Sequence, residues 1–250
     1  MNWESLKQAL IENKKNAAPK AVGSSSKKKN NLGIAQSSKA ISKKQAVAKG
    51  KAHGKSDQKV QEFDWTSKGG YIYPDKVTKK LALDCEFVGV GIDGKGNALA
   101  RVSIVNYEGE VVYDKYVCPE EQVVDYRTAV SGVTRSQLLH GDTFENVKKE
   151  VSELIRNRIV IGHAINNDFE VLKIFKHPKK LIRDTAKFVG FKSYFDDSFK
   201  SPSLKLLCKN VLSLDIQSGM HDSIKDAQHA LLLYKSQERA FEKSINSRYK

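Results

Sequence analysis

Residues 80–90 read KLALDCEFVGV, an apolar run interrupted by two acids, Asp84 and Glu86. Its Leu, Val and Phe content predicts a strand, in which alternation places both carboxylates on one face and Cys85 on the other. Charges in an apolar strand are costly unless compensated, and a divalent cation would compensate them directly. A solvent-facing sheet edge is the alternative, but Asp is depleted from strands and the flanking residues are typical of buried positions. We therefore expect Asp84 and Glu86 to be functional.

Strands and helices alternate downstream of this segment. We expect strands at 99–107, 110–117 and 158–162, and helices at 143–157, 168–175, 203–212 and 223–241. The first three strands should form an antiparallel meander, whereas a helix leading into strand 158–162 makes that strand parallel to one neighbour. The pattern predicts an α/β fold in which helices cover a mixed sheet.

Positive charge is concentrated near the N-terminus. Of the net charge of +14, residues 1–80 contribute +12, from 18 Lys or Arg and 6 Asp or Glu, which leaves +2 for residues 81–250. Residues 14–62 contain no Phe, Trp or Tyr and too few apolar side chains to offset the entropy of ordering, so we expect a disordered basic tail. Its Lys clusters suit nucleic-acid phosphates or a nuclear import receptor, and a merely solubilising tail is the alternative.

Composition also excludes several classes of protein. Only 40% of the residues are hydrophobic, and the longest apolar runs fall far short of the ~20 residues of a membrane-spanning helix. The first twenty residues lack the apolar stretch of a secretory signal. Three widely spaced cysteines, Cys85, Cys118 and Cys208, form neither a disulfide framework nor a zinc pattern, which favours a reducing compartment.

The chain is expected to have five parts. Residues 1–13 carry Trp3, Leu6 and Leu10 at helical spacing and form a possible short partner-docking helix, with a frayed terminus as the alternative. They are followed by the basic tail at 14–62, a lead-in segment at 63–79, a folded domain at 80–241 and a C-terminal tail at 242–250.

Two further acids follow predicted element boundaries. Asp168 starts a helix just after the buried strand 158–162, where open α/β sheets place their sites; a charge that favours the helix N-terminus is the alternative. His221 lies on a loop before the last helix, and a loop histidine suits a general base that accepts and releases a proton. Asp226 lies in the first turn of that helix, where it could instead complete an N-cap pattern with Ser223.

The combined pattern is specific where each motif alone is not. An acidic pair on the first strand, then G-H-x4-D after a strand, then H-x4-D opening the final helix, resembles the DEDDh family of 3′-to-5′ exonucleases. The strings LDCEFVGVG (83–91), ARVSIVN (100–106), DYRT (125–128), SGVT (131–134), GHA (162–164), NDF (167–169) and GMHDS (219–223) resemble the RNA exonuclease 4 group within it. The resemblance implies a ribonuclease-H-like mixed five-stranded sheet flanked by helices.

The resemblance also assigns roles to the acids and the histidine. It implies that Asp84, Glu86, Asp168 and Asp226 bind two divalent cations, Mg or Mn, and that His221 is the general base. Four carboxylates suit hard, oxygen-seeking cations, and two such ions can serve both the attacking water and the leaving oxygen of a phosphodiester.

Substrate contacts follow less directly. The segment around Gly132 resembles the one that packs beside the terminal nucleotide in the family, and Arg127 could reach a phosphate; a turn glycine and a surface charge are the alternatives. The candidate substrate-binding residues are Arg127, Ser131, Gly132 and Val133. By resemblance Phe87 lies near the expected 3′ end of the substrate, but alternation turns its side chain away from the carboxylates unless the strand bends, so its role is left open. His163 is expected to be a structural neighbour of the site.

The implied activity is that of a metal-dependent 3′-to-5′ exoribonuclease that releases nucleoside 5′-monophosphates from RNA. By resemblance we expect ribosomal RNA precursors as substrates, and a location in the nucleus and its nucleolus, with no membrane partner. Two alternatives remain open: an exonuclease that prefers DNA, and a ribosome-assembly factor that binds RNA or a pre-ribosomal protein through its N-terminal segment, with catalysis secondary.

Overall fold

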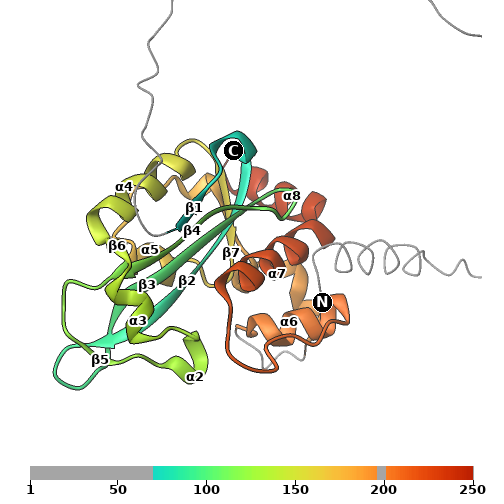
Figure 1. Cartoon of the computed structure of the whole chain (residues 1–250). Coiled ribbons are helices and arrows are strands. Elements are labelled where there is room, and N and C mark those ends of the chain that lie inside the picture. The colour runs from blue at the N-terminus through green and yellow to red at the C-terminus, as the bar shows by residue number, and fades with distance from the viewer. Residues whose placement is uncertain (1–69, 196–200, 250) are drawn as a thin grey trace, which may run out of the picture. The chain divides into compact units, whose positions relative to one another are not determined.

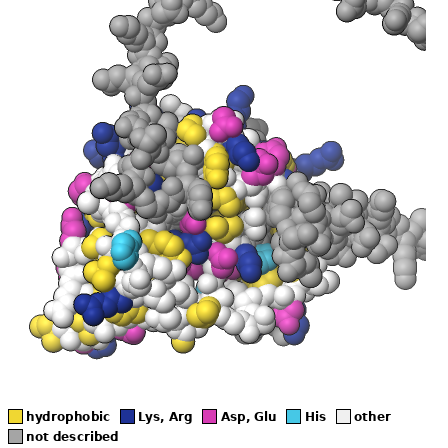
Figure 2. Space-filling view, viewed as in Figure 1, with side chains coloured by type: hydrophobic (Ala, Val, Ile, Leu, Met, Phe, Trp, Pro, Cys, Tyr) yellow, Lys and Arg dark blue, Asp and Glu magenta, His cyan; other side chains and the backbone are white. Residues whose placement is uncertain are grey.

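The computed structural model describes residues 70–195 and 201–249 (Figure 1). The expected docking helix at 1–13 and basic tail at 14–62 lie outside the described residues. No helix within the described ranges is both long enough and apolar enough to span a membrane. On the face that Figure 2 shows, acidic and basic side chains are interspersed, in keeping with the near balance of charge in residues 81–250.

The sheet has the expected mixed topology. Its order is β1-β4-β3-β2-β7-β8, with β5 also pairing β2 and β6 pairing β4. The strands are β1 (Gly70–Ile72), β2 (Lys80–Val90), β3 (Gly96–Asn106), β4 (Val111–Cys118), β5 (Val123–Asp125), β6 (Asp142–Thr143), β7 (Ile159–Gly162) and β8 (Ile182–Asp184). The antiparallel meander of β2, β3 and β4 is confirmed, and so is the parallel pairing of β7 with β2. Short β1, β5 and β6 extend the sheet beyond the five strands expected.

Helices cover both faces of the sheet (Figure 1). The α-helices are α2 (Thr128–Ser131), α3 (Arg135–Leu139), α4 (Phe144–Ile155), α5 (Asn166–Val171), α6 (Leu204–Leu212), α7 (Ser223–Ser236) and α8 (Glu238–Arg248). Short 3-10 helices lie at Pro74–Lys76, Lys179–Leu181, Thr185–Lys187 and Val189–Tyr194. On one face, Ala82 and Ile161 share a core with α6 and α7 residues; on the other, Leu81 and Leu83 pack with α4 and α5 residues.

Two of the predicted helices differ clearly from the prediction. The expected helix at 223–241 is two helices, because Gln237 leaves helical geometry and Phe241 of α8 stacks on Phe188 with ring centroids 3.6 Å apart. α8 continues to Arg248, so regular structure extends past the expected boundary at 241. The helix expected at 168–175 begins at Asn166 and ends at Val171, and Lys173 has a left-handed φ of 52° that is incompatible with continuing it.

One edge of β2 is open along its middle. β7 pairs only with Lys80–Ala82, and β5 pairs only with Gly89 and Val90, on the edge opposite β3. Within the described residues, positions 83–88 of β2 therefore have no strand partner on this edge. The two acids of β2 lie within this gap, which leaves backbone groups beside them available to other elements.

Candidate active site

β2 presents its two acids as alternation predicts. Cys85 packs in the core on the α4 and α5 face, so Asp84 and Glu86 point toward the α6 and α7 face. Glu86 is only 7% exposed, and Asp84 is half-buried. Neither carboxylate is a solvent-facing charge on the sheet, and that alternative is wrong.

Asp168 closes the gap beside β2. Its side chain is 4% exposed, and its Oδ1 accepts a hydrogen bond of 2.9 Å from the Cys85 backbone N–H. This donor is available because β7 has already ended. α5 takes Ile165 as its N-cap without a side-chain hydrogen bond. The carboxylate of Asp168 thus joins α5 to the acidic strand rather than serving only as a favourable charge at the helix N-terminus.

Asp226 enters from α7. The N-cap of α7 is Asp222, whose Oδ1 accepts from the Ile224 N–H at 3.1 Å, whereas Ser223 is the first helical residue and is fully buried. Asp226 is 5% exposed, and its Oδ2 accepts from Gln217 Nε2 at 2.8 Å. The alternative of a capping role with Ser223 is therefore wrong.

His221 stands at the edge of the site on the loop before α7. Its backbone N–H donates to Val130 O at 2.7 Å, which ties the loop to α2. Nδ1 lies 3.5 Å from Asp226 Oδ2 and 3.5 Å from Gln217 Nε2, and the side chain is 35% exposed. The imidazole is thus oriented by Asp226 while part of the ring still reaches solvent.

A cavity of about 340 Å³ brings most of these groups together. Asp84 and Glu86 from β2, Asp226 from α7 and His221 from its loop all line it, with Arg127, Ser131 and His163 among the other lining residues. Asp168 adjoins it through its bond to the Cys85 N–H. Acids more than 140 positions apart in the sequence therefore border one space.

Burial and mutual repulsion strongly raise the pKa values of the acids. Burial raises the pKa of Asp84 well above its usual value, and the negative charges of Asp168, Asp226 and Glu86 raise it further. The pKa of Glu86 rises to about 8, mainly through burial and then through Asp226, while Arg101 opposes the shift. Burial also raises the pKa of Asp168 to about 8, against the hydrogen bonding from Cys85. These side chains are clustered carboxylates whose negative charge Arg101 offsets only in part.

The donor set fits divalent cations. Glu86 Oε1 is buried and has no hydrogen-bond partner among the described residues, so it is a lone acceptor beside other acids. Within the described ranges, no three His, Cys, Asp or Glu side chains are grouped tightly enough to form a ready-made metal site, so the carboxylates surround a cavity rather than meet at one point. Negatively charged carboxylate oxygens are the ligands that Mg²⁺ and Mn²⁺ prefer.

The candidate substrate residues lie in different environments. Arg127 lines the cavity, but its guanidinium donates to Asn97 Oδ1 at 2.7 Å and to Gly94 O at 3.1 Å. Ser131 also lines it, and its hydroxyl donates to Tyr126 O at 3.0 Å. Gly132 has a φ of +66° next to His221, and Val133 is 1% exposed in a small core with Val88.

Two residues near the site, Arg101 and Gln217, had no role in the sequence-based prediction. Arg101 pairs with Asp114 at 2.8 Å and with Asp222 at 3.2 Å. Its positive charge lowers the pKa of Glu86. Gln217, with a left-handed φ of 54°, holds Asp226. Neither contact could be predicted from spacing along the sequence, because each depends on how α7 packs against the rest of the fold. His163 lines the cavity and bonds Thr185 at 3.0 Å, as a structural neighbour would.

Comparison with known sequences identifies a family. The sequence model of the RNase T exonuclease family matches residues 81–234. RNA exonuclease 4 of Xenopus tropicalis is 49% identical over 175 residues, which cover 69% of this chain and 41% of that protein. RNA exonuclease 4 of Mus musculus is 52% identical over 172 residues (69% and 39%), and that of Saccharomyces cerevisiae is 45% identical over 168 residues (67% and 57%). The chain thus spans 39% to 57% of the length of these relatives.

Solved structures agree. The Saccharomyces cerevisiae Pan2 pseudoubiquitin hydrolase–RNA exonuclease module in complex with AAGGAA RNA matches with a TM-score of 0.58 and 31% identity, over 74% of this chain and 34% of that one. The Neurospora crassa Pan2 catalytic unit matches with a TM-score of 0.56 and 30% identity, over 75% and 31%. The sheet is therefore ribonuclease-H-like. Together with the acids around one cavity, these matches show that the chain belongs to the RNase T family of DEDDh exonucleases, hydrolases that generally depend on divalent metal ions.

Proposed function

We propose that this chain is an exoribonuclease that removes nucleotides one at a time from the 3′ end of RNA and releases nucleoside 5′-monophosphates with the help of two divalent cations. The observation that carries the proposal is the cavity in which Asp84, Glu86 and Asp226 converge beside His221, with Asp168 against the same strand. The similarity to RNA exonuclease 4 proteins and to an RNA-bound Pan2 module supports RNA as the substrate.

The acids and the histidine divide the work of phosphodiester hydrolysis. Divalent cations held by the four carboxylates would supply a more acidic attacking water and would neutralise charge on the departing 3′ oxygen. His221 accepts the proton of that water at Nε2, since Nδ1 is the nitrogen turned toward Asp226. Partial exposure of the ring lets the proton pass on to solvent, and the tie from the His221 N–H to Val130 O keeps the imidazole near the cavity.

We further propose ribosomal RNA precursors as substrates and the nucleus, including the nucleolus, as the location. Support comes from the charge of +12 on residues 1–80, which would add affinity for RNA phosphates without sequence preference. The same segment could also bind a pre-ribosomal protein.

The test of this activity uses the full chain and single-stranded RNA labelled at its 5′ end. We expect a ladder of shortened labelled products and release of 5′-monophosphates with Mg²⁺ or Mn²⁺, and intact RNA with EDTA. Asp84→Asn should lower the rate by at least about 100-fold, because it removes one of the ligand charges. Intact RNA in every metal condition would overturn the proposal, and faster degradation of a matched DNA would assign the substrate to DNA instead.

A further inference from the structure

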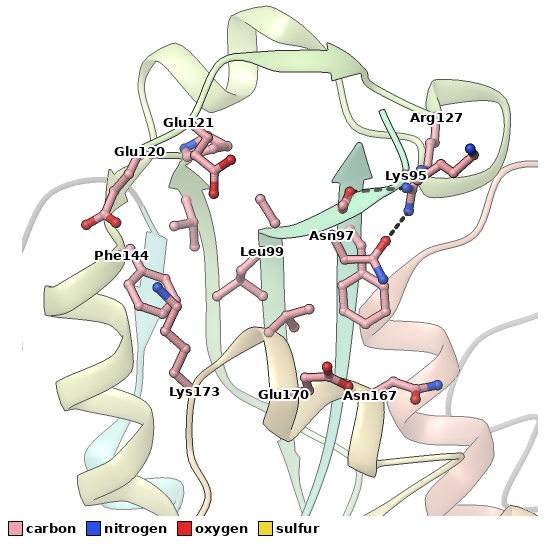
Figure 3. A pocket seen from close by; sticks show the side chains of 16 residues that line it. Lys95, Asn97, Leu99, Glu120, Glu121, Arg127, Phe144, Asn167, Glu170 and Lys173 are labelled. Atoms are coloured by element: carbon pink, nitrogen blue, oxygen red, sulfur yellow. Dashed lines mark hydrogen bonds between the residues drawn. The ribbon is translucent and has the colours of Figure 1, made fainter. Parts of the chain in front are cut away.

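A second, larger pocket lies beside the carboxylate cavity. Its volume is about 630 Å³, and it opens on the α4 and α5 side of β2 and β3 (Figure 3). Its floor is apolar, made by Leu99, Phe144 and the ring of Phe87. Figure 3 shows Asn97 reaching in from the β2–β3 hairpin and Glu170 from α5 on the opposite side. The pocket thus combines a hydrophobic floor with polar groups at its rim.

The two cavities meet across the open edge of β2. Phe87 and Arg127 line both of them, and positions 83–88 have no strand partner between β7 and β5. The acids face the α7 side of the strand, whereas Phe87 packs with the core on the α4 and α5 side. A chain whose phosphodiester lies at the acids can therefore place one nucleoside on each side of this edge.

The charges of the larger pocket suit a nucleoside better than a phosphate. Three cations, Lys95, Arg127 and Lys173, are balanced by three carboxylates, Glu120, Glu121 and Glu170. All three cations are also engaged: Lys95 pairs with Asp93 at 2.8 Å, Arg127 donates to Asn97 and Gly94, and Lys173 lies over the Phe144 ring at 4.8 Å. An uncharged base and ribose do not need a net charge in the pocket in order to bind. A base can also stack on aromatic side chains.

Resting on the proposed exoribonuclease activity, we propose that this pocket binds the nucleoside of the residue immediately 5′ of the terminal nucleotide and favours a base with an exocyclic amino group. Adenine, cytosine and guanine each offer an amino donor to Glu170. The single N–H of uracil lies between two carbonyl oxygens, which the carboxylate repels. The terminal nucleotide, which carries the scissile phosphate, occupies the smaller cavity with the acids.

The test compares RNAs that differ only in the second residue from the 3′ end. For removal of the terminal nucleotide by the full chain, adenine, cytosine or guanine there should lower the KM by roughly 2- to 10-fold relative to uracil, the effect of one hydrogen bond. An abasic second residue should raise the KM by at least about fivefold through lost stacking. Fluorescence anisotropy in the presence of EDTA, which prevents hydrolysis, should show the same preference in the Kd values of these RNAs.

Glu170→Gln should abolish the preference for amino-bearing bases, because an amide offers a donor as well as an acceptor. Glu145→Gln is the matched control: Glu145 is an exposed acid of α4 outside the pocket, and its removal should leave the preference intact. Equal Kd values for all second bases, a preference that depends only on the terminal base, or a preference that survives Glu170→Gln would each overturn the inference. Absence of RNA hydrolysis would instead overturn the proposed activity, since the anisotropy measurement does not depend on it.

Discussion

Arg101 Nη1 lies 3.2 Å from Asp222 Oδ1, so β3 is tied directly to the residue that caps α7. The same guanidinium donates twice to Asp114 of β4, at 2.8 and 3.0 Å, and its side chain is only 14% exposed. Because His221 precedes Asp222 and Asp226 follows it by one turn, this contact fixes two residues of the candidate active site relative to the sheet.

Arg101→Met should weaken both the fold and the activity. The substitution leaves Asp114 and Asp222 without their cation, and removing one partner of a largely buried pair costs about 3 kcal/mol. We expect a lower urea midpoint and, at a temperature where the variant remains folded, a lower kcat because the start of α7 is displaced. Arg135→Met on the exposed surface of α3 is the control. An unchanged kcat would show that Arg101 does not position the site.

Gly132→Ala should disturb the His221 loop. Gly132 has a φ of +66°, and an added Cβ would lie 3.3 Å from His221 O. A left-handed conformation at a non-glycine residue costs about 1–2 kcal/mol. The melting temperature should fall accordingly, and the rate of RNA hydrolysis should fall by more than the loss of folded protein explains. Gly219→Ala, with open space around its Cβ position, serves as the comparison; equal effects of the two substitutions would contradict the argument.

His221→Ala should separate proton transfer from metal binding. Loss of a general base lowers kcat by about 100- to 10,000-fold. The carboxylates are untouched, so the rise in melting temperature on adding Mg²⁺ should persist, whereas Asp84→Asn should reduce it. If His221→Ala abolished the Mg²⁺ effect as well, the histidine would have a role in holding the cations.

Glu242→Gln should change how stability responds to acid. Hydrogen bonds from Arg183, at 2.8 and 2.7 Å, are the main reason that the pKa of Glu242 is lowered below its ordinary value of 4.5. Such a carboxylate stabilises the fold above the unfolded-state pKa, and this contribution is lost as the pH falls through the lower folded-state value. Urea denaturation should therefore show a smaller loss of stability below about pH 4.5 for the variant than for the wild type. Glu108→Gln, at an exposed turn, should retain the wild-type acid response.

Local periodicity was sufficient to find the long elements of the fold, but not all of their ends. β2 spans the expected residues 80–90, and its alternation correctly put Asp84 and Glu86 on one face. Periodicity failed for β5 and β8, which have three residues each and owe their structure to pairing with distant strands. The break at Gln237 was equally invisible, because neither Gly nor Pro marks it and the packing of Phe241 determines where α8 lies.

The acids and the histidine of the candidate site were predictable from the sequence, but the contacts that position them were not. The sequence pattern pointed to Asp226, yet it equally allowed a cap formed with Ser223, and only the observed N-cap at Asp222 decided between them. Arg101 and Asp222 are 121 positions apart, so no local pattern could pair them. The position of Phe87 between the two cavities depends on the open edge of β2, which results from where β7 and β5 end.

An unpaired strand edge is a template for association with another chain, and proteins usually shield it. Here α5 and the hydrogen bond from the Cys85 N–H to Asp168 Oδ1 cover part of this edge, so we expect Asp168 to hinder edge-to-edge association as well as to contribute negative charge. Asp168→Ala would remove both the hydrogen bond to the strand edge and the negative charge. A loss of activity could then reflect insoluble protein as well as lost chemistry. Asn keeps an acceptor oxygen in place, which makes Asp168→Asn the substitution that distinguishes lost chemistry from lost solubility.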